Sequence, residues 1–386
     1  MNHCRNIYRK VQEFVESTYP HEPKGNLKRN MNTLVAMITG IIIGKGTQLP
    51  QIALNVPETI KLPSTEKRFK RLIINDKTTE QTYYLPFIQS VLNKLGLEEM
   101  VLAIDGSLVG RGCICLMISL IYKNRALPLV FSVVKGKKGH FPESAHVELV
   151  QKLRPLIPEA TKRVVFLGDG EFDGTLLQQT LTGFGWKYVC RTSPNITFYK
   201  GDEAFKIEIL AAMLPKGHYN GTSNCRITHE EYGSVTTLAW WDEGHEGPIF
   251  LVTNFVSKSK ACDYYAMRFT IETFFSDQKS RGFNIDKSHL SCPRRLTRLM
   301  FASCLAYLWI IFCGIFALKT GFHRHIHRSD RCDLSLFQLG LRLLTFLAVR
   351  GLPIPGFELL NADDLPGIEP ENWPGQPNLI NVFGLL

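Results

Sequence analysis

The chain has 386 residues, 45% of them hydrophobic, which allows two or three globular domains and excludes a low-complexity chain. The net charge of +10 and the pI of about 9.1 favour a polyanionic partner such as nucleic acid, with a generic basic protein as the alternative. The ten cysteines form no CxxC pair and no His/Cys cluster of zinc spacing, which indicates reduced thiols in a cytoplasmic protein. The polar N-terminus indicates that no signal peptide is present.

Residues 1–96 are helical in pattern and carry fourteen Lys or Arg against seven Asp or Glu. Ser64 can begin a short basic helix in which Phe69 and residues 72–74 pack inward while the cations face outward. Short helices that end in a basic one are typical of helix-turn-helix-like readers of DNA. A helical linker with a solvated basic face is the alternative. The predicted DNA contacts are Lys67, Arg68, Lys70 and Arg71.

Short apolar strands begin near residue 100. We expect strands over 101–104, 114–122, 127–134, 163–167 and 187–190, a hairpin turn at 123–125, and helices over 143–153 and 173–181. This order, three strands, helix, strand, helix, strand, is the one expected of an RNase H-like α/β core. Residues 192–260 are polar, turn-rich and strand-prone, and they interrupt the core; the clearest strands there are 235–241 and 249–254.

Two acids end predicted apolar strands. Asp105 lies in VLAIDGS and Asp169 in VVFLGDG, so both are placed at the edge of a sheet, although single Asp-Gly pairs usually mark turns. With Glu272 on a predicted helix they form a D-D-E set. Three converging carboxylates repel one another unless a cation lies between them, and oxygen ligands suit Mg²⁺ or Mn²⁺. Two such ions can activate an attacking oxygen and stabilise the leaving oxygen of a phosphodiester.

Four polar residues share the spacing Y-x2-R-x3-E-x6-K: Tyr265, Arg268, Glu272 and Lys279. At about 100° per residue they would occupy one stripe of a helix, roughly 60° wide. A carboxylate flanked by a guanidinium, an ammonium and a phenol suits a metal ion beside a phosphate. The alternative is an ordinary solvated helix face.

The segment 300–318 is 19 residues long and has no charge, with Arg298 and Lys319 flanking it. Length and flanks fit a transmembrane helix, so a single-span membrane protein is one alternative. A buried core helix is the prediction, since no second span exists and the segment follows the predicted catalytic helix. Another apolar helix is expected over 334–349, and the Pro-rich tail from Gly351 is expected to have little regular structure.

The spacing of the four polar residues resembles the YREK signature of the IS4-family DDE transposases and matches it at all four positions. The residues 104–107 (IDGS) and 169–174 (DGEFDG) are similar to the family's motifs around its two Asp residues. A β-rich insertion before the Glu and an apolar run after the YREK helix are also usual in that family. The resemblance covers roughly residues 30–350. One departure is Phe269, where some relatives have Trp.

The resemblance implies a cut-and-paste transposase of an insertion sequence. Asp105, Asp169 and Glu272 would hold two Mg²⁺ or Mn²⁺ ions, and Tyr265, Arg268 and Lys279 would contact phosphates near the scissile bond. The implied partners are double-stranded DNA, as the element's terminal inverted repeats and the target, and a second copy of the chain on paired ends. No membrane is implied, and the location is the bacterial cytoplasm at the nucleoid. A transposase-derived DNA-binding protein without catalysis is the alternative.

Two further sets of residues could contact DNA. Some relatives hold a flipped base on a Trp, which Trp240 or Trp241 could do here, but not both, since neighbours in a strand face opposite sides; a core strand Trp is the alternative. Lys137 and Lys138 lie in a basic loop that either contacts DNA or is simply solvated. Glu143 and Glu171 are expected to be structural acids.

The predicted organisation has five parts: a helical DNA-binding domain over 1–96, the first part of an RNase H-like core over 97–191, a β-rich insertion over 192–260, the remaining core with the catalytic and apolar helices over 261–325, and a C-terminal helix with its Pro-rich tail over 326–386.

Overall fold

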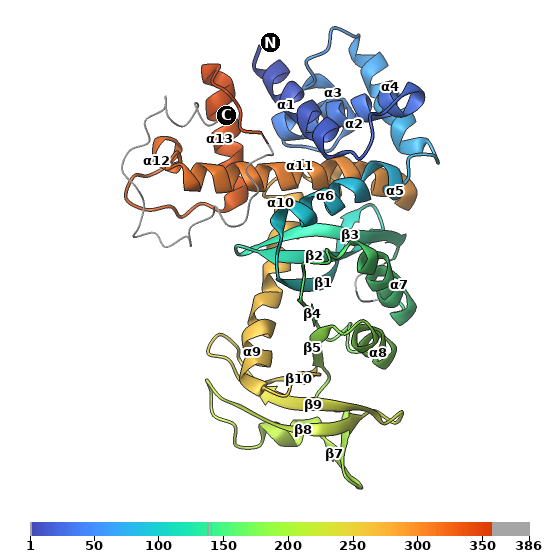
Figure 1. Ribbon diagram of the computed structural model, residues 1–386, viewed down its shortest axis with the longest axis vertical. Coiled ribbons are helices and arrows are strands. Elements are labelled where there is room, and N and C mark those ends of the chain that lie inside the picture. The colour runs from blue at the N-terminus through green and yellow to red at the C-terminus, as the bar shows by residue number, and fades with distance from the viewer. Residues whose placement is uncertain (1, 137–138, 140, 357–386) are drawn as a thin grey trace.

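A mixed ten-stranded sheet runs through the described part of the chain, a computed structural model that covers residues 2–136, 139 and 141–356 (Figure 1). Its strand order is β3-β2-β1-β4-β5-β10-β9-β8-β6-β7. The strands of the first half are β1 (Glu99–Gly110), β2 (Cys113–Tyr122), β3 (Arg125–Lys135), β4 (Arg163–Gly168) and β5 (Lys187–Thr192). Strands β1, β2 and β3 are antiparallel neighbours, whereas β4 runs parallel to both β1 and β5.

The β2–β3 hairpin shows why these residues form strands. Every residue of β2 is buried, so both faces of this apolar strand are covered by other parts of the protein. The turn residues Lys123 and Asn124 both have positive φ angles, 48° and 58°, as in a two-residue hairpin turn whose twist matches that of the strands. The predicted hairpin turn is confirmed.

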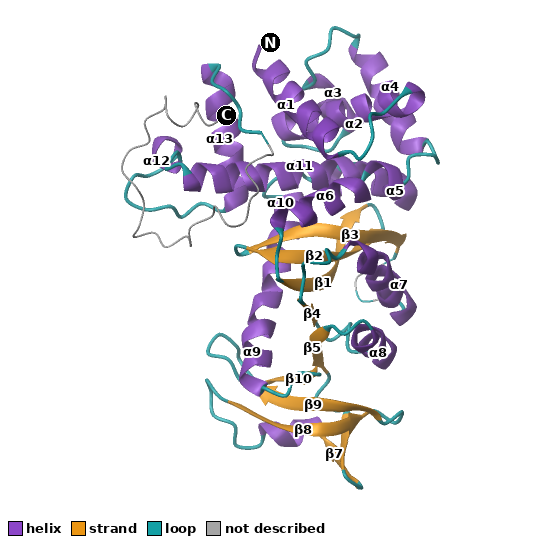
Figure 2. Cartoon of the chain, viewed as in Figure 1, coloured by secondary structure: helices purple, strands orange, loops and turns teal. Residues whose placement is uncertain are grey.

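Helices cover both faces of the sheet. Helices α7 (Glu143–Leu153) and α8 (Thr175–Gly183) lie on one face, and α9 (Lys258–Ala266) and α10 (Ile271–Gln278) lie on the other (Figure 2). The predicted order of three strands, helix, strand, helix, strand is confirmed. Strand β1 continues six residues beyond its predicted end, because residues 105–110 pair with β2.

The predicted insertion extends the same sheet. Its strands are β6 (Thr197–Lys200), β7 (Glu203–Lys206), β8 (Tyr219–Ile227), β9 (Tyr232–Trp240) and β10 (Ile249–Thr253). Strand β10 pairs antiparallel with β5 and with β9, so it joins the later strands to the first half of the sheet. The two strands that the sequence predicts most clearly here correspond to β9 and β10. The domain boundaries themselves stay a prediction.

Helices precede the sheet, as predicted. They are α1 (Asn2–Thr18), α2 (Gly25–Gly44), α3 (Leu49–Leu54), α4 (Leu62–Ile74), α5 (Glu80–Tyr83) and α6 (Leu85–Leu95). Helix α2 is buried at most positions from Met31 to Ile42 because it contacts α1, α3, α4 and α11. Helix α6 ends at Gly96, whose φ of 56° is the left-handed conformation typical of a helix C-terminus.

Helix α11 (Pro293–Lys319) is the central helix of the upper part of the molecule. It is long and apolar enough to cross a membrane by length and composition, yet its apolar window is entirely buried inside the protein. It packs against α2, α4, β3 and α13 (Leu336–Arg350). The prediction that residues 300–318 form a buried helix is therefore confirmed.

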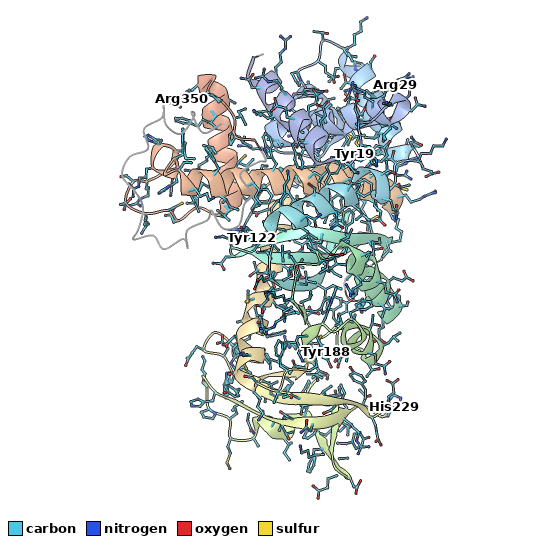
Figure 3. All side chains as sticks on the ribbon, viewed as in Figure 1. Tyr19, Arg29, Tyr122, Tyr188, His229 and Arg350 are labelled. Carbon is cyan, nitrogen blue, oxygen red and sulfur yellow. The ribbon has the colours of Figure 1, made fainter. Side chains whose placement is uncertain are left out.

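The described chain is elongated, with helices at one end and strands at the other. Arg350, the last residue of α13, and His229, in the β8–β9 turn, lie near opposite ends (Figure 3). The remaining short elements are η1 (Arg154–Leu156), η2 (Ile207–Ala211), η3 (Met267–Thr270), η4 (Ile285–Lys287) and α12 (His323–Ile326). Most of the predicted Pro-rich tail, residues 357–386, lies outside the described residues.

Candidate active site

Asp105 and Asp169 lie at the same level of two neighbouring parallel strands. The β1–β4 pairing ends at Ala103↔Leu167, and each Asp lies two residues beyond that pair. Asp169 directly follows β4, as predicted, whereas Asp105 lies inside β1, so its predicted place at a strand end is wrong. The reason is that β1 keeps its second neighbour, β2, after β4 has ended.

Backbone N–H groups hold both carboxylates. Asp105 is buried, and its Oδ1 accepts a hydrogen bond from the Gly106 N–H at 2.7 Å. Asp169 is half-buried, and its Oδ1 accepts from the Glu171 N–H at 3.0 Å within a tight turn. Gly168 permits this turn, since a Cβ there would lie 2.7 Å from the Cβ of Phe172.

The segment with the YREK spacing is not one continuous helix, so that prediction is wrong. Tyr265 lies in α9, Arg268 in the 3₁₀-helix η3, and Glu272 in the first turn of α10. A 3₁₀-helix has about 3.0 residues per turn, so it rotates the following residues away from the predicted stripe. Lys279 follows α10 with non-helical φ and ψ of −99° and −130°. The chain turns there because Gly282 packs closely on α10, where a Cβ would lie 2.0 Å from the Asp277 carbonyl oxygen.

Arg268 and Glu272 still form an ion pair, with 3.7 Å between Nη2 and Oε1. The Arg268 guanidinium is buried and lies over the Phe269 ring at 4.3 Å. Its Nε and the buried hydroxyl of Tyr265 have no hydrogen-bond partner among the described residues. Orphaned buried donors are rare, so each indicates a site for a ligand atom or water.

Burial raises the pKa of Tyr265 to about 12, and the nearby charges of Arg268 and Arg191 oppose that shift, while Asp169 adds to it. The phenol is therefore protonated at neutral pH and can donate a hydrogen bond. Its electrostatic coupling to Asp169 also places α9 and the end of β4 in one neighbourhood, in agreement with the contact between these two elements.

Lys279 contacts β1 from the turn after α10, and not from the predicted helix. Its Nζ donates to the Ser107 Oγ at 2.6 Å, and Ser107 is two residues after Asp105 in β1. The ammonium group thus lies beside the strand of the first acid, although its backbone has left the helix of Glu272.

The donor set fits a divalent cation only in part. The carboxylates of Asp105 and Asp169 supply the hard oxygen ligands that Mg²⁺ prefers, at one edge of the sheet. The side chain of Glu272 is 61% exposed and pairs with Arg268 instead. Among the described residues, no group of three His, Cys, Asp or Glu is close enough to hold a metal ion. The strand register thus brings two of the three predicted ligands to one level, and the third, on α10, pairs with Arg268.

Two residues near Asp169 were missed by the sequence analysis. Arg191 lies on β5, where Cys190 pairs with Gly168, so Arg191 and Asp169 lie at the same level. A charged residue after an apolar strand was the available signal, the same one that identified Asp169. His146, in α7, is buried and electrostatically coupled to Asp169, and a lone His in a predicted helix gave no signal at all.

The two spare acids are structural, as expected. Glu143 Oε1 accepts from the Leu177 N–H at 2.9 Å, in the first turn of α8. Glu171 Oε1 accepts from the Phe141 N–H at 3.3 Å. A carboxylate at a helix N-terminus satisfies one of the unpaired N–H groups there.

Three of the four predicted cations of α4 are exposed: Lys67, Lys70 and Arg71. Their spacing places them on one face of the helix, opposite the buried Phe69. Arg68 differs, because it is half-buried in an ion pair with Glu58, with 2.7 Å between Nη2 and Oε2. Lys137 and Lys138 lie outside the described residues.

The two Trp residues lie at the end of β9, a strand that contacts α9. Trp240 is buried, and its ring lies 6.3 Å from that of His245, which in turn lies 5.8 Å from the Phe269 ring. Trp241 is half-buried and donates its Nε1–H to the His245 carbonyl at 3.2 Å. Neither Trp presents a fully open ring face in this structure.

Comparison with protein families identifies the class of the chain. The family model described as "Transposase DDE domain" matches residues 98–309, more than half of the chain, and this span includes Asp105, Asp169 and Glu272. The chain therefore belongs to the transposase DDE-domain family, a family of nuclease-type enzymes that act on DNA and generally use divalent metal ions. No curated protein matches the chain.

Proposed function

We propose that the chain is an IS4-type transposase that moves an insertion sequence by cut-and-paste, through metal-dependent hydrolysis of phosphodiesters and strand transfer. The observation that carries this proposal is the placement of Asp105 and Asp169 at the same level of the neighbouring parallel strands β1 and β4. The strand order β3-β2-β1-β4-β5 supports an RNase H-like core around them, with β1, β4 and β5 parallel.

Asp105, Asp169 and Glu272 would hold two Mg²⁺ or Mn²⁺ ions, which would polarise the scissile phosphate and lower the pKa of an attacking hydroxyl group. To reach the ion site, the Glu272 carboxylate would have to leave its ion pair with Arg268. The Glu272 carboxylate is largely exposed and 3.7 Å from Arg268, whose buried guanidinium would then need a phosphate oxygen as its new partner.

The remaining residues of the site would bind the DNA backbone. Tyr265 and Arg268 offer buried donors without a partner among the described residues, and phosphate oxygens are acceptors. Lys279, beside β1, would supply a positive charge near Asp105, and Arg191 one near Asp169. These four side chains come from α9, η3, β5 and the turn after α10, so they surround the two acids from different elements.

The exposed face of α4, with Lys67, Lys70 and Arg71, would bind the duplex of the terminal repeats outside the catalytic core. A homodimer on paired DNA ends, without membrane insertion and in the bacterial cytoplasm, completes the proposal. These features rest on the resemblance to IS4-family enzymes and on the basic charge of the chain.

The decisive experiment is a cleavage assay on labelled duplexes that carry the element's own ends, with Mg²⁺, with Mn²⁺ and with chelator. We expect nicking and strand joining only with a divalent ion. Specific binding of the ends without any cleavage under every metal condition would contradict the proposal.

That outcome would favour the second candidate, a transposase-derived DNA-binding protein without catalysis. One observation supports this alternative: among the described residues, no group of three His, Cys, Asp or Glu is placed to hold a metal ion. The two candidates share the DNA substrate and differ only in the cleavage step, so the metal-dependent assay separates them.

A further inference from the structure

His146 is a polar residue at the candidate site for which the function proposed above gives no role. It lies in α7 with only 2% of its surface exposed, and neither ring nitrogen has a hydrogen-bond partner among the described residues. Buried polar groups in folded proteins are nearly always paired, so the two ring nitrogens have capacity for hydrogen bonds that the described residues do not make in this structure.

The surroundings of His146 point to the second acid. Its ring packs edge-on against Phe172, with 4.7 Å between the ring centroids. The Phe172 N–H in turn donates to the Asp169 carbonyl at 3.0 Å, so His146 rests on the turn that carries Asp169. A neutral imidazole has one N–H donor and one acceptor, so one of its ring nitrogens can donate a hydrogen bond to a carboxylate oxygen.

The Asp169 carboxylate has one oxygen tied to the Glu171 N–H. Carboxylates that bind metal ions are commonly oriented by further hydrogen bonds from neighbouring side chains, and loss of such a bond weakens metal binding about 10–100-fold. We propose that His146 is a positioning residue of the ion site: in the ion-loaded protein, a ring N–H donates to the Asp169 carboxylate and fixes its orientation toward the ion. This inference rests on the metal-dependent function proposed above.

The test measures Mn²⁺ binding by electron paramagnetic resonance, and melting temperature in chelator, for the full chain. Asp169→Asn serves as the reference for loss of an ion ligand. His146→Leu, close to imidazole in volume, is expected to weaken Mn²⁺ binding at least about tenfold. Its melting temperature without metal is expected to stay equal or to rise, because an unpaired buried polar group has been removed. Replacing a residue with a purely structural role would not weaken Mn²⁺ binding while leaving the melting temperature equal or higher.

Two further variants sharpen the test. His146→Gln retains a hydrogen-bond donor at the end of the side chain and is expected to recover Mn²⁺ binding at least about threefold over His146→Leu. Ser119→Ala is the matched control: Ser119 is also buried without a partner among the described residues, but it lies in β2, which β1 separates from β4. It is expected to bind Mn²⁺ like the wild type.

The outcomes separate this inference from the proposed function. Wild-type Mn²⁺ affinity in His146→Leu, together with lost affinity in Asp169→Asn, would overturn the inference and leave the metal site intact. A fall of both affinity and melting temperature in His146→Leu that Gln does not relieve would assign His146 to packing alone. Absence of Mn²⁺ binding in the wild type, or unchanged binding in Asp169→Asn, would instead refute the proposed metal-dependent function.

Discussion

The three acids of the candidate site are held to different degrees. Asp105 is 5% exposed inside β1, Asp169 is half-buried in a tight turn, and Glu272 is 61% exposed on the side chain beside Arg268. The first two are fixed by backbone N–H groups, whereas the third can rotate. We therefore expect ion binding to change the position of the Glu272 side chain more than that of either Asp.

Neutralising each acid tests the ion site directly. We expect Asp105→Asn, Asp169→Asn and Glu272→Gln each to reduce cleavage of end-bearing duplexes at least about a hundredfold, because each removes a charged oxygen ligand while keeping the shape. Binding of the ends, measured by gel shift, should change little. Glu98→Gln, at an exposed ion pair with Lys162, is the control and should cleave normally. Near-normal cleavage by any one of the three would remove that residue from the proposed ligand set.

Asp277 predicts a pH dependence of stability. Burial raises its pKa to about 6, although Arg125 lies 3.5 Å away and opposes this shift. Because the pKa is higher in the folded than in the unfolded chain, the folded state binds the proton more tightly. The stabilisation from the protonated form is complete below pH 4 and is lost as the pH rises from 4 to 6.

Asp277→Asn should therefore be more stable than the wild type at pH 7, by at most about 3 kcal/mol, and equally stable near pH 4. Urea unfolding at pH 4, 5, 6 and 7 measures the difference. A stability difference that does not grow with pH would show that Asp277 is not penalised by burial.

At the scale of single elements, α4 presents its cations in two ways. Lys67, Lys70 and Arg71 are free to face a duplex, while Arg68 is tied to Glu58. Replacing the three exposed residues by Ala should reduce the log–log slope of DNA affinity against salt by about 2–3 units, because each phosphate contact contributes about 0.9. Arg68→Ala should mainly lower the melting temperature. Lys162→Ala, on an exposed surface of the sheet, should leave the slope unchanged; an unchanged slope in the triple variant would place the DNA interface elsewhere.

The contact between α11 and α13 depends on two glycines. A Cβ at Gly340 would lie 2.0 Å from the Ile310 carbonyl oxygen, and one at Gly314 would lie 2.1 Å from that of Leu336. Gly340→Ala should therefore destabilise the protein by about 1–3 kcal/mol through overpacking, despite the better helix propensity of Ala. Gly183→Ala in α8, where a Cβ meets nothing within 4 Å, is the matched control and should be neutral or slightly stabilising. Equal melting temperatures of the two variants would contradict the tight contact.

Element order was predictable because it depends on local patterns. The apolar runs of β1, β2 and β4 and the hairpin turn at Lys123 have strand and turn signatures in the sequence. The path of the segment 265–279 was not predictable, because the end of α10 before Lys279 depends on close packing around Gly282. The positions of Asp105 and Asp169 beside each other depend on strand patterns and were foreseeable, whereas the unpaired nitrogens of His146 and the ion pair of Glu272 with Arg268 depend on tertiary packing and were not.

At the scale of the whole molecule, strands β1 and β4, which position the two acids, lie between a helical end and a strand-rich end (Figure 1). The basic α4 packs on α11 in the helical part, and β6–β10 extend the sheet beyond β5 on the side away from β1. Of the strands, β1, β4 and β5 position residues of the candidate site, and its other residues come from α9, η3, α10 and the turn after α10. An elongated chain can contact a DNA duplex over several surfaces. It nevertheless has a single proposed active site for cleavage.

A single site of this kind acts on one DNA end at a time, so release of an element from both flanks is expected to require two subunits on paired ends. We expect mixtures of wild type with Glu272→Gln to form paired-end complexes that are cut at one end only, because each subunit would cut one end. The measurement is gel analysis of a doubly labelled substrate across mixing ratios. With equal amounts and random pairing, about half of all assemblies should contain one subunit of each kind, and these should be singly cut. Asp263→Asn, at an exposed residue of α9, is the matched mixing partner and should leave both ends cut. Cutting of both ends at a rate independent of protein concentration, with no singly cut product in the Glu272→Gln mixture, would show that one subunit serves both ends.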